Sequence, residues 1–265
     1  MRAPHTSLLP TATGEVEYLV TRTGAPVTVY AHGLLGSIDE ARTLASGVAG
    51  TAAFLSFRGH GRTRATDGRW DYAGLAAELS AVSDHVAATQ AVGMSLGSGA
   101  LLRLLSADPH RFTRVVLMLP AAVDVVRTDR AIWRSLAGRV VAGDVAGVAR
   151  SMLSGQPPQV RDVDEAREHY RRAAQELVDG PAETLRALRT LPFATPVDDR
   201  ASLRAIDVPV LVVSQRDDPL HPLAVGEELA GLLPAARLHV LARPGEMWLG
   251  RRELREVLTG FLASG

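Results

Sequence analysis

Residues 90–105 read QAVGMSLGSGALLRLL, and this stretch decides the fold. The short run 90–94 predicts a strand, and 96–105 is rich in Leu at the spacing of a helix. Ser95 stands at the junction, with Gly93 and Gly97 as its small neighbours. A serine on a tight turn from a strand into a helix projects above the sheet, and small neighbours permit the close backbone approach that this turn requires. The pattern predicts that Ser95 is a nucleophile, whereas Ser98 is expected only to pack.

Strands and helices alternate on both sides of this stretch. Further strands are predicted at 16–20, 27–31, 52–57, 114–119, 208–214 and 237–241, and further helices at 72–86, 224–233 and 251–262. The first two strands, separated by the turn residues 23–26, are expected to form an antiparallel hairpin. Continuous apolar strands with helices between them predict a mostly parallel sheet that is covered on both faces.

The region 123–207 interrupts the alternation. It holds several amphipathic helical stretches, such as 163–178 and 181–190, without a convincing strand. The sequence therefore predicts a core formed by 1–122 and 208–265 and an inserted helical lid formed by 123–207.

A glycine-containing turn follows the strand that ends at Ala31. The segment reads His32-Gly33-Leu34-Leu35-Gly36, and glycine allows such a turn to aim a backbone N–H at the space above the sheet. Leu34 and Leu96, the residue after the nucleophile, are therefore the candidate donors of an oxyanion hole. Two such donors would stabilise the negative charge of a tetrahedral intermediate. His32 itself is expected to be a structural, hydrogen-bonded turn residue.

Four motifs together resemble the α/β-hydrolase superfamily. They are HGLLGS at 32–37, SFRGHGRT at 56–63, GMSLGSG at 93–99 and VPVLVVSQRDDPLHP at 208–222, in the order of that family. The resemblance implies an α/β-hydrolase fold with a helical lid over most of the chain. It also implies a catalytic acid after the strand that follows the lid, where Asp218 fits best and Asp217 is the alternative. In the family, the histidine of the SFRGHGRT turn (His60) is usually structural.

The chain departs from the family near its end. The family places its catalytic histidine between the last strand and the final helix, and the corresponding segment, 241–248, reads LARPGEMW. Glu246 occupies the place of the histidine, and we expect its carboxylate to lie beside Ser95 and Asp218. A carboxylate with an ordinary pKa of about 4.3 is a weak base toward a serine hydroxyl, unless burial or a like charge raises that pKa.

Three readings of this departure stay open. His221, three residues after Asp218, could serve as the base, although Pro222 favours a helix start there. Glu246 could perform non-hydrolytic acid–base chemistry, as in a lyase, dehydratase or cyclase. The protein could also have lost catalysis and kept a ligand-binding pocket. His239 lies within a predicted strand and is expected to pack or to face solvent.

Composition narrows the function further. The 29 basic and 29 acidic side chains balance, so neither nucleic acid nor an acidic membrane surface is an expected partner. No Cys is present, and no motif requires a metal, a flavin or a nucleotide, so no cofactor is expected. No secretory signal or membrane-spanning run is found, which makes the cytoplasm the expected location. The prediction is an enzyme that hydrolyses an ester or related bond in a small or medium organic molecule, with the oligomeric state open.

Overall fold

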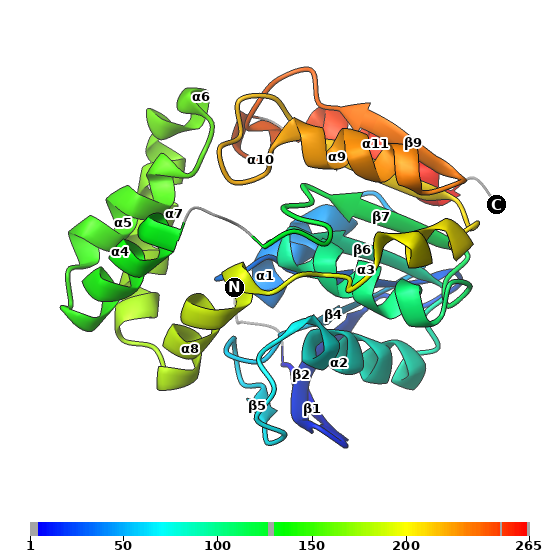
Figure 1. Cartoon of the computed structure of the whole chain (residues 1–265), viewed down its shortest axis with the longest axis horizontal. Coiled ribbons are helices and arrows are strands. Elements are labelled where there is room, and N and C mark those ends of the chain that lie inside the picture. Colours follow the sequence, from blue (N-terminus) through cyan, green and yellow to red (C-terminus); the bar gives the residue numbers. More distant parts are fainter. Residues whose placement is uncertain (1–4, 127–129, 250, 264–265) are drawn as a thin grey trace.

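A single sheet forms the centre of the computed structural model, which describes residues 5–126, 130–249 and 251–263 (Figure 1). Its strands are β1 (Ser7–Thr11), β2 (Gly14–Thr21), β3 (Val27–Ala31), β4 (Thr51–Leu55), β5 (Arg64–Ala65), β6 (Gln90–Met94), β7 (Arg114–Met118), β8 (Val210–Ser214) and β9 (Ala236–Val240). They are arranged in the order β1-β2-β4-β3-β6-β7-β8-β9, with β5 paired to β2. All neighbouring pairs from β4 to β9 are parallel. The prediction of a mostly parallel sheet is confirmed.

The predicted hairpin at the start of the chain is wrong. β4 lies between β2 and β3, pairing antiparallel with β2 and parallel with β3. β3 is thus a central strand, and four of its five residues are buried, as expected for a strand that is covered on both faces. The turn at 23–26 therefore joins two strands that are not neighbours, because β4 lies between them.

Helices cover both faces of the sheet. One face is covered by α2 (Tyr72–His85), α3 (Leu96–Ala107) and α9 (Leu223–Leu232), which share an apolar core with β3, β7 and β8. The other face carries α1 (Ile38–Arg42) and α11 (Arg252–Ala263), packed on a second core that includes Phe54 and Val213. Because the sheet is closed on both sides, its carboxyl-terminal edge is where side chains from several strands can meet around a ligand.

Helices without any strand fill the described part of 123–207. They are α4 (Arg130–Val141), α5 (Val145–Ser154), α6 (Pro158–Arg161), α7 (Asp164–Val178) and α8 (Ala182–Thr190), followed by the short 3₁₀ segments η2 (Leu191–Phe193) and η3 (Arg200–Ala205). Helices α4 to α8 stand beside the sheet (Figure 1), and α4, α5, α7 and α8 share an apolar cluster of their own. In contrast, Leu191, Leu203 and Ile206 belong to the main core. The chain thus rejoins the core before β8 begins.

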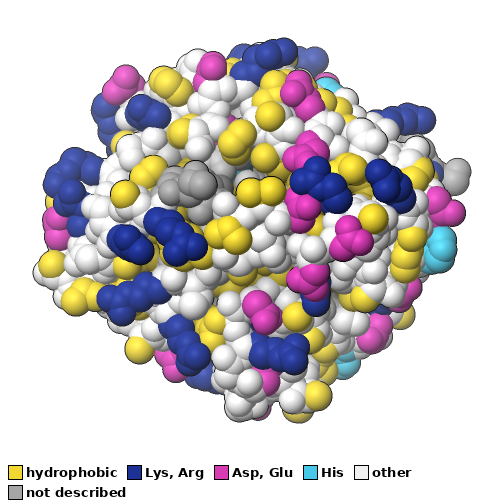
Figure 2. Space-filling model, viewed as in Figure 1, with side chains coloured by type: hydrophobic (Ala, Val, Ile, Leu, Met, Phe, Trp, Pro, Cys, Tyr) yellow, Lys and Arg dark blue, Asp and Glu magenta, His cyan; other side chains and the backbone are white. Residues whose placement is uncertain are grey.

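The surface charge is uneven on the face seen in Figure 2. Dark-blue basic side chains gather on the left of this view, where Figure 1 shows α4 to α8, and acidic side chains are more frequent toward the middle and right. No helix in the described ranges is long and apolar enough to span a membrane.

Candidate active site

Ser95 lies on a strained turn between β6 and α3. Its backbone angles are φ 51° and ψ −106°, a region that residues with a side chain rarely adopt. A Cβ on Gly93 would lie 2.4 Å from the carbonyl oxygen of Gly97, and a Cβ on Gly97 would lie 2.4 Å from that of Ala31. Only glycine fits at these two positions, so the turn that the sequence predicted is enforced by its neighbours.

The neighbouring serine has a structural role. Ser98 is fully buried, and its hydroxyl donates to the carbonyl oxygens of Gly93 at 2.7 Å and Met118 at 2.9 Å. Its oxygen is therefore committed to holding β6, β7 and α3 together, which leaves Ser95 as the serine at the sheet edge.

His221 connects Ser95 to Asp218. Its Nε2 lies 2.9 Å from Ser95 Oγ, and its Nδ1 lies 3.0 Å from Asp218 Oδ2. The carboxylate can only accept, so Nδ1 carries the proton and Nε2 is left to accept from the serine hydroxyl. The Asp218 side chain is 3% exposed and the His221 side chain 15% exposed, which shields both hydrogen bonds from water. A hydroxyl, an imidazole and a carboxylate are thus aligned in one row, which is the arrangement that serine hydrolysis requires.

The loop after β8 folds back on itself to create this arrangement. Asp218 Oδ1 accepts the backbone N–H groups of Leu220 at 2.9 Å and His221 at 3.0 Å, a turn typical of aspartate. Pro222 is the residue just before α9, so His221 precedes the helix and its side chain can turn toward Ser95. Asp217 is exposed, with a positive φ of 56°, and lies on the outside of the turn.

Asp218 carries a charge stabilised by its partners. Burial alone would raise the pKa of its carboxyl, but hydrogen bonds and charge attraction from His221, with further donors on Gln215 and Leu220, outweigh burial and hold the pKa below its ordinary value. Asp218 is therefore ionised at neutral pH.

Glu246 lies elsewhere than predicted. Its carboxylate is fully buried, with Oε2 at 3.0 Å from the Arg243 guanidinium and Oε1 accepting the backbone N–H of Glu253 at 3.1 Å. The prediction that it fills the place of the imidazole is wrong, because His221 occupies the position between Ser95 and Asp218. The first N–H groups of a helix lack partners within the helix and attract a carboxylate. Glu246 satisfies one of them at α11 and so joins α10 (Glu246–Leu249) to that helix.

The two predicted oxyanion donors remain available. Leu96 is the first residue of α3, and none of the hydrogen bonds among the described residues uses its N–H or that of Leu34. A Cβ on Gly33 would lie 3.5 Å from Ser95 Cβ, so the turn before Leu34 passes close to the serine. Its shape is fixed by a 3.0 Å hydrogen bond from the N–H of Gly36 to the carbonyl oxygen of Gly33.

Two buried histidines accept hydrogen bonds that support this turn. His32 Nε2 accepts the N–H of Phe57 at 3.1 Å, and His60 Nε2 accepts that of Leu35 at 2.9 Å. Burial lowers the pKa of His32 to about 3 and that of His60 to about 4. Both rings are therefore neutral, because a protonated ring could not accept these hydrogen bonds. They act as structural groups that join the Leu34 turn to the loop after β4.

Acid should weaken this support, and His60 offers a test. Its pKa is depressed in the fold, so its contribution to stability is full above the unfolded value of about 6.5 and is lost as the pH falls toward about 4. The stability difference between the wild type and His60→Asn should shrink by about 1.4 kcal/mol per pH unit in this window. Urea unfolding of both proteins at pH 7, 6, 5 and 4.5 measures it, and comparing the two cancels the contributions of other groups. A difference that does not change with pH would contradict the neutral, bonded His60.

Helices of the region 130–190 flank the site on two sides. Leu34 and Leu35 pack against the apolar cluster of α4 to α8. A Cβ on Gly155, at the end of α5, would lie 2.7 Å from Leu220 in the loop of Asp218 and His221. The space above Ser95 is therefore bordered by the same helices that the sequence predicted as a lid.

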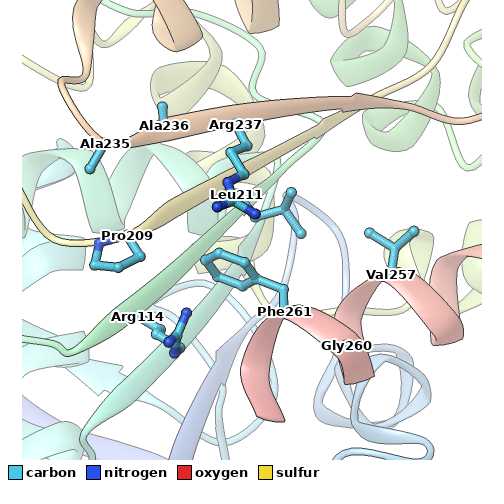
Figure 3. A pocket seen from close by; sticks show the side chains of 9 residues that line it. All are labelled: Arg114, Pro209, Leu211, Ala235, Ala236, Arg237, Val257, Gly260 and Phe261. Atoms are coloured by element: carbon cyan, nitrogen blue, oxygen red, sulfur yellow. The ribbon is translucent and has the colours of Figure 1, made fainter. Parts of the chain in front are cut away.

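A separate cavity of about 610 Å³ lies at the opposite edge of the sheet. Figure 3 shows Arg114 and Arg237 on either side of the Phe261 ring, with Pro209 and Leu211 nearby. These residues stand at the amino ends of β7, β8 and β9 and on α11, whereas Ser95 follows the carboxyl end of β6. Among the described residues, no serine, histidine or carboxylate lines this cavity, and Ser95 is not part of it.

Comparison with known proteins agrees with this geometry. Residues 26–248 match the family model described as alpha/beta hydrolase fold. The chain belongs to this family. The predictions of the α/β-hydrolase fold and of a hydrolase-like enzyme are thereby confirmed.

Solved α/β-hydrolase structures share the fold over nearly the whole chain. An alpha/beta hydrolase enzyme from a deep-sea metagenome library aligns with a TM-score of 0.83 at 15% identity, covering 98% of each chain. An esterase from Exiguobacterium antarcticum aligns with a TM-score of 0.81 at 16% identity, covering 98% of this chain and 100% of that chain. A carboxylesterase from Bacillus subtilis aligns with a TM-score of 0.82 at 18% identity, covering 100% and 93%. Identities this low establish the shared fold alone.

One residue at the site was missed in the sequence. Gln215 follows directly after β8, is buried, and donates from Nε2 to Asp218 Oδ2 at 2.6 Å. The available signal was a polar side chain at the end of a buried strand in an α/β-hydrolase, three residues before the predicted acid.

Proposed function

We propose that this α/β-hydrolase cleaves an ester or related bond in a small or medium organic molecule with Ser95 as nucleophile, His221 as base and Asp218 as acid. The observation that carries the proposal is the continuous row of hydrogen bonds, 2.9 Å from Ser95 to His221 and 3.0 Å from His221 to Asp218. The esterase neighbours support the same class of bond. Helices α4 to α8 are the proposed lid, and Glu246 has no place in this relay.

The geometry allows both halves of the reaction. Ser95 Oγ attacks the carbonyl carbon while its proton passes to His221 Nε2, and the ionised Asp218 stabilises the resulting imidazolium. The N–H groups of Leu34 and Leu96 are the proposed donors to the oxyanion. Collapse of the tetrahedral intermediate expels the alcohol, which takes the proton from Nε2 and leaves an acyl ester on Ser95. Water then repeats the sequence, giving its proton to Nε2 and releasing the carboxylic acid as Ser95 recovers its proton.

A fluorophosphonate probe tests the proposal. The wild type should form a phosphonyl ester at Ser95 with loss of fluoride, because the probe reacts with serines that an adjacent base activates. Mass spectrometry of the digested protein locates the label. Ser95→Ala should abolish labelling, while Ser135→Ala, which changes an exposed serine on α4, should label like the wild type. A folded wild type that is not labelled, or a label that persists in Ser95→Ala, would overturn the proposal.

A further inference from the structure

Gln215 joins the acid to a distant loop. Its side chain is 5% exposed, with Nε2 donating to Asp218 Oδ2 at 2.6 Å and Oε1 accepting the backbone N–H of Gly245 at 2.8 Å. The orientation of the amide follows from these partners, because an N–H can be paired only with the amide oxygen and a carboxylate only with the amide nitrogen. Both ends of the side chain are therefore committed.

The loop on the other side of Gln215 is well anchored. Gly245 precedes Glu246, which is bound to Arg243 and to the start of α11. Trp248, three residues after Gly245, packs its ring against His169 and Tyr170 of α7, with centroids 4.9 Å and 5.5 Å away. Gly245 thus offers Gln215 a fixed point that does not belong to the turn of Asp218 and His221.

The turn that carries Asp218 requires an anchor outside itself. The acid and the base are only three residues apart, and Asp218 Oδ1 is already bound to backbone N–H groups of its own loop. Oδ2, which faces His221 Nδ1, has Gln215 as its donor from outside the turn. Without that donor, the carboxylate and the imidazole could shift together away from Ser95.

We infer that Gln215 is a positioning residue for the proposed relay: it ties Asp218 Oδ2 to Gly245 and so holds His221 in line with Ser95. This inference rests on the proposed function. In this arrangement, the loop between β9 and α10 orients Asp218 through the side chain of Gln215.

Two variants separate the two hydrogen bonds. Gln215→Met keeps the length of the side chain but removes both bonds. Gln215→Glu keeps an acceptor for Gly245 N–H, removes the donor to Asp218 and adds a second carboxyl beside it. The control is Gln175→Met, because Gln175 on α7 also donates to a carboxylate, that of Asp179 at 2.8 Å, but on the exposed surface.

The readout is the rate of fluorophosphonate labelling of Ser95 across pH, at a temperature where circular dichroism shows each variant folded. Losing a hydrogen bond to a charged group should lower the labelling rate about 10- to 100-fold in Gln215→Met. The acidic midpoint of the labelling profile should also move upward, by about one pH unit in Gln215→Glu, because added negative charge beside Asp218 favours the protonated form of the imidazole that Asp218 binds. Gln175→Met should match the wild type in both respects.

The outcomes are distinct. Wild-type labelling with slower variants and a shifted midpoint supports the inference. Equal rates in the wild type and the Gln215 variants would overturn the inference while leaving the proposed function intact. Slower labelling with an unchanged midpoint in both variants would show that Gln215 only supports the fold. Absence of labelling in the wild type would instead overturn the proposed function.

Discussion

Replacing His221 by alanine is expected to lower kcat/KM for p-nitrophenyl acetate by about 10⁴-fold or more, because the base of a serine relay acts as one unit with the nucleophile. Among the described residues, His221 Nε2 is the side-chain atom within hydrogen-bond distance of Ser95 Oγ, at 2.9 Å, and it can accept the proton of the hydroxyl. Initial rates of p-nitrophenol release at pH 8 measure the effect, with the variant and the wild type assayed under identical conditions.

Two controls accompany this variant. His110→Ala removes an exposed histidine, 66% accessible at its side chain, and should leave the rate unchanged. Glu246→Gln should stay within about threefold of the wild type, because surface and structural substitutions away from the reacting atoms leave transition-state contacts intact. If Glu246→Gln lost activity and His221→Ala kept it, the roles assigned to these two residues would have to be exchanged.

Replacing Glu246 by leucine is expected to lower the free energy of unfolding by about 1–3 kcal/mol, because the N–H of Glu253 at the start of α11 would be left without its acceptor. The lost pair with Arg243 should add little, since the Arg243 side chain is 60% exposed and stays hydrated. Urea unfolding measures the change. Labelling of Ser95 by fluorophosphonate, well below the unfolding midpoint, should remain within about threefold of the wild type, because Trp248 still packs against α7 and keeps Gly245 in place.

The matched control lies on the same helix. Glu256→Leu removes an exposed carboxylate that pairs only with Arg252 at 3.0 Å, and its effect should stay below about 0.5 kcal/mol. Glu246→His, which restores the residue type usual in the family, should destabilise the protein like Glu246→Leu and should not raise ester turnover. A gain of turnover in Glu246→His would mean that a base at 246 can reach Ser95 after all.

Local sterics made the nucleophile predictable. Gly93 and Gly97 flank Ser95 because any side chain there would collide with the backbone. This steric requirement is visible in the sequence as the pattern Gly93, Ser95 and Gly97. Asp218 was predictable from the resemblance to the α/β-hydrolases, in which the acid follows the strand after the helical insertion. By contrast, the position of β4 between β2 and β3 depends on which distant strands pair, which no local pattern of 14–31 contains.

The choice between Glu246 and His221 was beyond the sequence for another reason. Both follow strands, β8 and β9, at the same edge of the sheet, and the decision depends on where each side chain turns. Glu246 turns to the unpaired N–H of Glu253, and His221 is turned inward by a backbone bond from its own N–H to Asp218 Oδ1. Hydrogen bonds between a side chain and a backbone group determine both orientations. The order of motifs along the sequence contains no information about these bonds.

The three-residue spacing of Asp218 and His221 separates the proposed relay from position 246. His221 reaches Ser95 from the loop before α9, whereas the side chain of Glu246 turns to Arg243 and to the start of α11. The side chain at 246 can therefore be redesigned to stabilise the last helix without rebuilding the relay, provided that Gly245 keeps its hydrogen bond to Gln215.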